Sequence, residues 1–162
     1  MKKHTHVHRA KAPFVRVLIA LLFIAGIAAA IEIMDFFPQA GFVEANVIDV
    51  EGTTITMGRD CTAIVAETTA DQARSIRLGK EKRIDVRPTT HDLYVETLRS
   101  FNITVENAAV VRFDSDVYYG ELVLRSADRV LRLDSRPTDA IAVALRAGVP
   151  IMLNRTMLEQ QG

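Results

Sequence analysis

Residues 133–145 read LDSRPTDAIAVAL, and this stretch decides the fold. It begins as the end of a strand, turns at Arg136-Pro137-Thr138 and continues into a helix from Asp139 to Ala147. Proline suits a first helical position, because its missing N–H would have no partner there. The helix is apolar on nearly every side, which is typical of a helix buried among other elements. We therefore expect a buried helix that Gly148 ends.

A similar corner occurs earlier in the chain. Asp85-Val86-Arg87-Pro88-Thr89 and Asp134-Ser135-Arg136-Pro137-Thr138 share the pattern D-x-R-P-T, and we call them the first and second corners. A short strand, Arg83–Val86, is predicted before the first corner, and a helix of about Thr90–Phe101 after it. The repeat predicts two similar strand-to-helix corners.

Alternating apolar residues and turn signals on either side of these corners predict two antiparallel meanders. The strands of the first are Phe42–Val50, Thr53–Met57 and Cys61–Glu67, and those of the second are Thr104–Phe113, Val117–Arg125 and Arg129–Asp134. A capping box from Thr69 to Gln72 predicts a helix over 70–78 that Gly79 ends. Val149–Leu153 is a last short strand, with Asn154 placed to cap a final turn. The expected class is α+β, with mostly antiparallel strands in two meanders and three main helices on one side.

The N-terminal part has a different character. Val17–Ile31 is apolar without interruption, and with its apolar neighbours it would make a helix about 27 to 30 Å long, just enough to cross a membrane. Residues 1–16 hold five basic and no acidic side chains, which predicts a cytoplasmic tail and an extracytoplasmic C-terminal part. The expected order is a tail (1–16), a transmembrane helix (17–34), a linker (35–41) and a folded domain (42–158). The alternative is a signal sequence cleaved near Ala28-Ala29-Ala30, which would export a soluble domain.

Composition excludes several classes of protein. The chain has 162 residues, of which 49% are hydrophobic and 25% charged, so it can bury one ordinary core. A single cysteine excludes an intramolecular disulfide framework, a four-cysteine zinc site and a CxxC redox motif. Of its 20 basic residues five lie in the tail, so the remainder carries 15 basic against 20 acidic groups, a net charge of −5. Nucleic acid would therefore have to bind through a local basic surface.

Such a surface is available around the first corner. Arg74 to Arg87 contains six basic residues against two acids, and this run could contact phosphates or form a solvated helix face. Arg87 and Arg136 each stand in a corner, and a guanidinium there can bind phosphate or carboxylate through two hydrogen bonds. The backbone N–H groups at a helix start add to an anion site.

Groups that transfer protons or bind cations lie beside these arginines. Histidine takes up a proton near neutral pH, and His91 follows the first corner directly. Asp92, Asp134 and Asp139 supply carboxylates that could hold a divalent cation or a water molecule. A histidine that transfers protons, carboxylates that bind a cation and arginines that bind phosphate could together catalyse phosphodiester hydrolysis. The alternative is structural, with the acids paired to arginines or placed at helix starts.

Four segments resemble the bifunctional nuclease domain family over roughly Phe42 to Leu158. They are Arg87–Leu93 (RPTTHDL), Tyr118–Leu122 (YYGEL), Leu133–Leu145 (LDSRPTDAIAVAL) and Val149–Ile151 (VPI). The resemblance implies an α+β domain, often a homo-oligomer, in a family named for members that act on both DNA and RNA.

Two hypotheses follow from the residues and the resemblance. In the first, the chain is a membrane-anchored nuclease that hydrolyses phosphodiester bonds in single-stranded DNA or RNA with Mg²⁺ or Mn²⁺. Its residue roles are a general base (His91), carboxylates that bind the metal or water (Asp92, Asp134, Asp139) and phosphate-binding arginines (Arg87, Arg136). In the second, the domain is a non-catalytic, oligomer-forming module that binds an anion or a partner.

Overall fold

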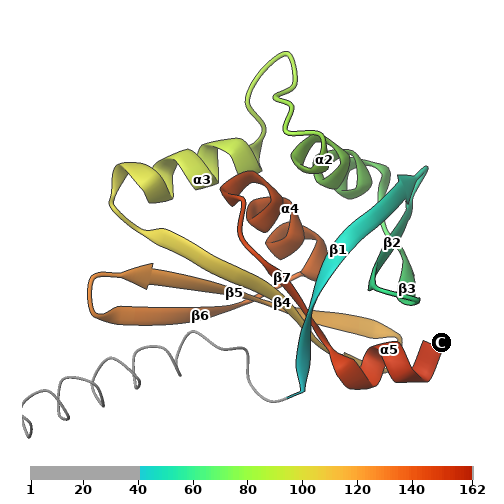
Figure 1. Ribbon diagram of the computed structural model, residues 1–162. Helices are drawn as coiled ribbons and strands as arrows, with labels where there is room; N and C mark the ends of the chain where they lie inside the picture. The colour runs from blue at the N-terminus through green and yellow to red at the C-terminus, as the bar shows by residue number, and fades with distance from the viewer. Residues whose placement is uncertain (1–40, 162) are drawn as a thin grey trace, which may run out of the picture. The chain divides into compact units, whose positions relative to one another are not determined.

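Seven strands form one sheet in the computed structural model, which describes residues 41–161 (Figure 1). The strands are β1 (Phe42–Glu51), β2 (Thr54–Arg59), β3 (Thr62–Glu67), β4 (Thr104–Asp114), β5 (Val117–Ser126), β6 (Arg129–Ser135) and β7 (Ile151–Asn154). The helices are α2 (Ala70–Lys80), α3 (Thr90–Ser100), α4 (Pro137–Ala147) and α5 (Arg155–Gln161). The predicted α+β class is confirmed, and most predicted elements are present with bounds shifted by one to three residues.

The sheet consists of the two predicted meanders joined by β7. Its order is β3-β2-β1-β7-β4-β5-β6. All neighbours within each meander are antiparallel, as is the pair of β1 and β7. β4 and β7 are parallel, with Ala108 opposite Ile151 and Val110 opposite Leu153. The last strand of the chain therefore lies in the middle of the sheet.

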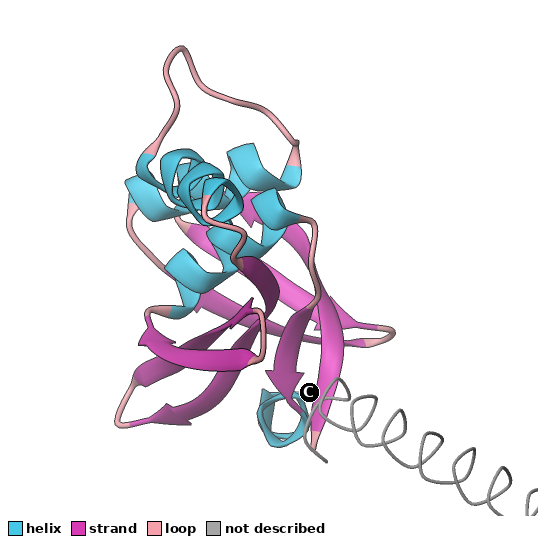
Figure 2. Ribbon diagram, turned by 90° about the vertical axis from the view of Figure 1, so that its left-hand side faces the viewer, coloured by secondary structure: helices cyan, strands magenta, loops and turns pink. Residues whose placement is uncertain are grey.

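Helices α2, α3 and α4 lie on the same face of the sheet, with α4 between the other two (Figures 1 and 2). Residues 140–144 of α4 are all buried, and α4 contacts β4 and β5 as well as both neighbouring helices. The buried helix predicted from 133–145 is thus confirmed. It ends where Gly148 adopts a left-handed conformation, with φ at 73°.

The prediction that Gly79 ends the first helix is wrong. α2 continues to Lys80, and Gly79 lies inside it. A Cβ atom at Gly79 would lie 3.0 Å from the Leu145 Cβ and 3.0 Å from an Arg146 nitrogen. The absence of a side chain at Gly79 allows α2 and α4 to approach each other closely. The same glycine lowers the stability of the helix by about 1 kcal/mol relative to alanine.

The two corners differ more than their shared pattern predicts. The second corner runs from β6 into α4 with Pro137 as the first helical residue, as expected. Arg83–Val86 is not a strand, because these residues belong to a loop that projects from the helical layer (Figure 2). Asp85 pairs with Arg74 and accepts the N–H of Val86. α3 then starts at Thr90, so Pro88 lies before its N-cap residue rather than at the first helical position.

The C-terminal helix follows β7 directly. Asn154 accepts hydrogen bonds from the backbone N–H and the hydroxyl of Thr156, at 3.1 and 2.9 Å, so the predicted cap is confirmed. Met157 and Leu158 of α5 are buried in the core.

The predicted tail (1–16), transmembrane or signal segment (17–34) and most of the linker (35–41) lie outside the described residues. Within residues 41–161, no helix combines the length and the apolar character needed to span a membrane.

Candidate functional site

His91 connects the helices that follow the two corners. It lies in the first turn of α3, where its Nδ1 is 2.9 Å from the Ser75 hydroxyl of α2. Its Nε2 is 3.4 Å from a carboxylate oxygen of Asp139, in the first turn of α4. His91 and Asp139 are partly exposed, whereas Ser75 is only 8% exposed. The structure therefore brings together His91 and Asp139, two of the predicted site residues.

Arg136 extends this chain of contacts toward solvent. Its Nε donates to the second carboxylate oxygen of Asp139 at 2.7 Å, while its side chain remains 70% exposed. Asp139 thus bridges a histidine and an arginine. We call Ser75, His91, Asp139 and Arg136 the His91 network.

The contacts of His91 determine where its proton lies. A carboxylate oxygen lies beside Nε2, and because such an oxygen accepts hydrogen bonds, this position favours a hydrogen on Nε2. A hydroxyl can donate or accept, so Ser75 suits a neutral ring and a charged ring alike. Ser75 of α2 and Asp139 of α4 thus contact the two ring nitrogens of His91 from two different helices.

Asp92, by contrast, has the surroundings of a structural carboxylate. It accepts hydrogen bonds from the N–H and hydroxyl of Thr89, both at 2.7 Å, and from Nε of Arg146 at 2.5 Å. The side chains of Arg146 and Asp92 are only 7% and 13% exposed. Burial would raise the pKa of Asp92, but the hydrogen bonds from Thr89 and the Arg146 guanidinium together lower it. Asp92 therefore stays ionised and fastens α3 to α4.

Two other predicted site residues lie apart from the His91 network. Asp134 is opposite Glu121 in the pairing of β5 and β6, so the two side chains share a face. Leu133 and Leu122 share the other face, which packs against the core under the helices. Arg87 is exposed in the loop, and neither its side chain nor that of Asp134 has a hydrogen bond or ion pair within the described residues. Across residues 41–161, no three His, Cys, Asp or Glu side chains form a group that could hold a metal.

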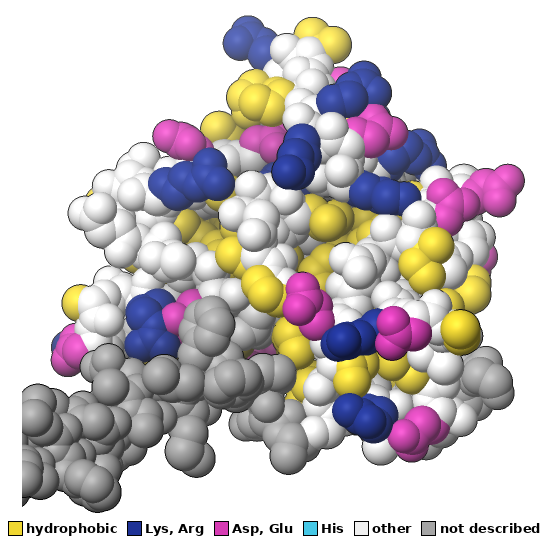
Figure 3. Space-filling model, viewed as in Figure 1, with side chains coloured by type: hydrophobic (Ala, Val, Ile, Leu, Met, Phe, Trp, Pro, Cys, Tyr) yellow, Lys and Arg dark blue, Asp and Glu magenta, His cyan; other side chains and the backbone are white. Residues whose placement is uncertain are grey.

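Basic side chains gather over the helical layer, but part of the run from Arg74 to Arg87 has structural partners (Figure 3). Arg77 donates to backbone carbonyls of Val50 and Gly52, and Lys80 to that of Ile48. These contacts tie α2 to β1. Arg83 forms an ion pair with Glu81, as Arg74 does with Asp85. The segment from Arg74 to Arg87 therefore forms a basic surface, and two of its side chains, Arg77 and Lys80, also hold α2 against β1.

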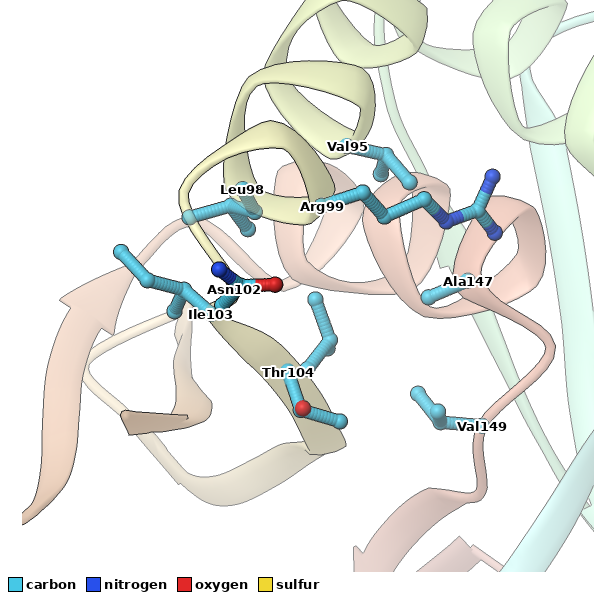
Figure 4. Close-up of a pocket in the computed structure, with 9 residues that line it drawn as sticks. Val95, Leu98, Arg99, Asn102, Ile103, Thr104, Ala147 and Val149 are labelled. Atoms are coloured by element: carbon cyan, nitrogen blue, oxygen red, sulfur yellow. The ribbon is translucent and has the colours of Figure 1, made fainter. Parts of the chain in front are cut away.

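Two hollows differ in their relation to the His91 network. One, of about 340 Å³, lies between α3, the end of α4 and the start of β4 (Figure 4). Its only ionisable side chain is Arg99, which extends over α4 and donates to the Arg146 carbonyl. The other, of about 290 Å³, includes Arg136 in its lining, so it adjoins the acid–base groups.

Comparison with known proteins identifies the family of the folded domain. A family model described as the bifunctional nuclease domain matches residues 44–162. This chain belongs to the bifunctional nuclease domain family. The match includes both corners and every residue of the His91 network.

Curated relatives cover less of the chain. An uncharacterized protein of Mycobacterium tuberculosis is 31% identical over 91 residues, which are 56% of this chain and 54% of that protein. A protein named bifunctional nuclease 1 from Oryza sativa subsp. japonica is 30% identical over 79 residues, 47% of this chain and 24% of its own length. The chain therefore matches about half of one relative and a quarter of the other.

Sequence reasoning missed two residues of this family domain that support the site. Ser75 lies among buried residues of α2, and a hydroxyl on the apolar side of a helix is a signal for a buried hydrogen bond. Arg146 stands in the last turn of α4, a position usually explained by the helix dipole. Nothing in its local sequence indicates that it pairs with Asp92, which is 54 residues away.

Replacing Asp92 with asparagine should leave the buried Arg146 guanidinium without its counter-charge. We expect Asp92→Asn to lower the free energy of unfolding by about 3 kcal/mol at pH 7, measured by urea denaturation. Asp71→Asn, in the exposed first turn of α2, is the matched control and should cost about 0.5 kcal/mol or less.

The effect should depend on pH in one direction. The folded-state pKa of Asp92 is lowered, so its contribution is complete above the unfolded value of about 3.9. It is lost as the pH falls through the folded value. The difference between wild type and Asp92→Asn should therefore be constant from pH 7 to pH 5 and shrink toward pH 3. A difference that is equal at pH 7 and pH 3 would contradict this explanation.

Proposed function

We propose that the chain is a nuclease that hydrolyses phosphodiester bonds in single-stranded DNA or RNA. Membership of the bifunctional nuclease domain family supports the activity, and the His91 network carries the assignment of a site. A partly exposed imidazole held on both nitrogens, beside an arginine that is 70% exposed, combines proton transfer with phosphate binding.

In the proposed reaction a water molecule attacks phosphorus, and the bond from phosphorus to one sugar oxygen breaks. His91, the general base predicted from the sequence, takes the proton that the attacking water loses and then gives this proton to the leaving sugar oxygen. Asp139 keeps the ring oriented and stabilises its charged form. Arg136 binds the phosphate oxygens, and Arg87 is proposed to bind a neighbouring phosphate from the loop.

A divalent cation, Mg²⁺ or Mn²⁺, is part of this proposal. Mg²⁺ is commonly held by one or two carboxylates together with substrate phosphates and water. Asp139 fits this requirement as one carboxylate beside the proposed phosphate position, whereas Asp134 lies on a sheet face away from the core. The cation would neutralise charge that develops on the phosphate.

A second candidate function is an oligomer-forming binding module. Apolar side chains are exposed on the loop of the first corner, where Val86 is 96% and Ile84 66% exposed. Leu93 follows them on α3 and is also exposed. Exposed apolar residues that cluster in this way are typical of protein contact surfaces. We propose that this loop contacts a second copy of the chain.

The location proposed for the domain follows from the N-terminal sequence. The apolar segment 17–34 would anchor the chain in a membrane, with the basic residues 1–16 in the cytoplasm and the nuclease domain extracytoplasmic.

Cleavage of labelled single-stranded DNA and RNA by the purified full-length chain tests the activity, with Mg²⁺ or Mn²⁺ and with EDTA. We expect His91→Ala to slow cleavage about 100-fold or more, because proton transfer by a positioned side chain contributes at least that much. Glu96→Ala, an exposed change on the same helix, should cleave at the parent rate. Equal cleavage rates for the parent and a folded His91→Ala would refute the assigned site. Unchanged cleavage in EDTA would refute the requirement for a divalent cation.

Light scattering during size-exclusion chromatography tests the contact between copies. We expect the parent to elute with a mass above that of one chain, and Val86→Asp to reduce it because a carboxylate would be buried in the contact. Val65→Asp, at an exposed apolar residue of β3, is the control. A parent with the mass of one chain would exclude the contact.

Membrane fractions washed with alkaline carbonate test the anchor in cells that make the full chain. An integral helix should keep the protein in the membrane pellet, and a variant without residues 17–34 should not. A parent released by the wash would show that the segment does not anchor the chain.

A further inference from the structure

A groove of about 290 Å³ opens beside Arg136, on the side of the His91 network that faces β2 and β3. It lies between these two strands, the start of β5 and the first turns of α4. Its walls are mainly apolar and come from four elements: Ile55, Met57, Ile64, Val110 and Ile141. The volume is near the lower end of small-molecule sites, so the groove suits a group the size of one planar ring system.

An aromatic side chain forms part of one wall. Tyr118 lines the groove, and its ring is packed against Phe113 with centroids 4.5 Å apart. Aromatic and apolar walls of this kind favour stacking of a flat heterocycle, and every nucleobase presents such a face.

The groups on the β3 and α2 side of the groove can read the edge of a base. Glu67 accepts hydrogen bonds from the Thr54 and Thr53 hydroxyls, which lower its pKa and keep it an ionised acceptor. Gln72 turns its carbonyl oxygen toward the N–H of Thr69, so its NH₂ group is left without a partner in the described part of the chain. The rim therefore offers both an acceptor and a donor, the two kinds of group found on base edges.

The other end of the groove suits a phosphate. Arg136 and Thr138 both line it, and no side chain caps the start of α4. The positive end of α4 and the exposed guanidinium, whose Nε pairs with Asp139, favour an anion at this end, although the groove lining also includes the acids Glu67 and Asp116. Arg136 is the residue of the His91 network that also lines the groove, so the two adjoin at this side chain.

We propose that this groove binds one unstacked nucleobase of a single strand while Arg136 holds an adjacent phosphate. The identity of the ligand rests on the proposed function. Such a site would select a single strand, because a paired and stacked base in a duplex cannot enter a pocket of this size without leaving the helix.

Direct binding, measured in EDTA, separates this inference from catalysis. The full-length chain is titrated into a fluorescein-labelled oligocytidylate, and into an abasic oligomer of the same length and charge. We expect the base-bearing strand to bind about tenfold more tightly, the effect of stacking one base. A fully paired duplex should show no such advantage over the abasic strand.

Two neighbouring residues of β3 provide a matched pair of variants. Ala66 lines the groove and Val65 does not, and successive residues of a strand point to opposite faces. Ala66→Phe should fill the groove and remove the tenfold advantage, whereas Val65→Phe should retain it. Val117→Trp fills the groove from the opposite wall and serves if Ala66→Phe fails to fold.

The outcomes are distinct. Loss of the advantage in Ala66→Phe or Val117→Trp, with retention in Val65→Phe, supports the base site. Equal binding of base-bearing and abasic strands by the parent, or equal behaviour of the groove-filling and control variants, overturns it. Base-dependent binding without any cleavage in the activity assay would overturn the nuclease proposal and leave the base site standing.

Discussion

The side chain of Arg146 holds the helical layer in place. Its guanidinium donates to Asp92 and Thr89 at the start of α3, to the Ser75 carbonyl of α2 and to a carbonyl of its own helix. Because a buried charge without a partner costs several kcal/mol, the positions of three helices depend on one ion pair. Ser75 and Asp92 are also the neighbours of His91, through a hydrogen bond and through the chain. The orientation of the imidazole therefore depends on an arginine to which it has no hydrogen bond in the described structure.

Much of the fold could be predicted because its signals are local. The buried helix of residues 137–147, both meanders and the cap at Asn154 follow from patterns within a few residues. The prediction of a strand at Arg83–Val86 is wrong: its residue types suit a strand, but the segment is not among the seven strands of the described sheet. The prediction that Gly79 ends its helix is wrong for a related reason. The role of Gly79 is set by Leu145 of another helix, and such a contact has no local signature.

The site could be predicted only in part, because several of its contacts join residues that are far apart in the sequence. His91 and Asp139 meet because each stands in the first turn of a helix that follows a corner, and the pattern that marks the corners is visible in the sequence. Asp134 stands in the same motif, but the alternation of side chains along β6 turns it to the face of Glu121. Ser75 was missed because its partner is 16 residues away, on a separate helix.

The central position of β7 has a consequence for how the chain folds. Residues 151–154 pair with β1 on one side and β4 on the other. The two meanders therefore cannot join into one sheet until this segment has been synthesised. Strand pairings between distant parts of a chain form slowly, because the conformational entropy of a long loop is lost before the contacts that offset this loss are made. The domain should therefore complete its core after translation of these residues rather than during it.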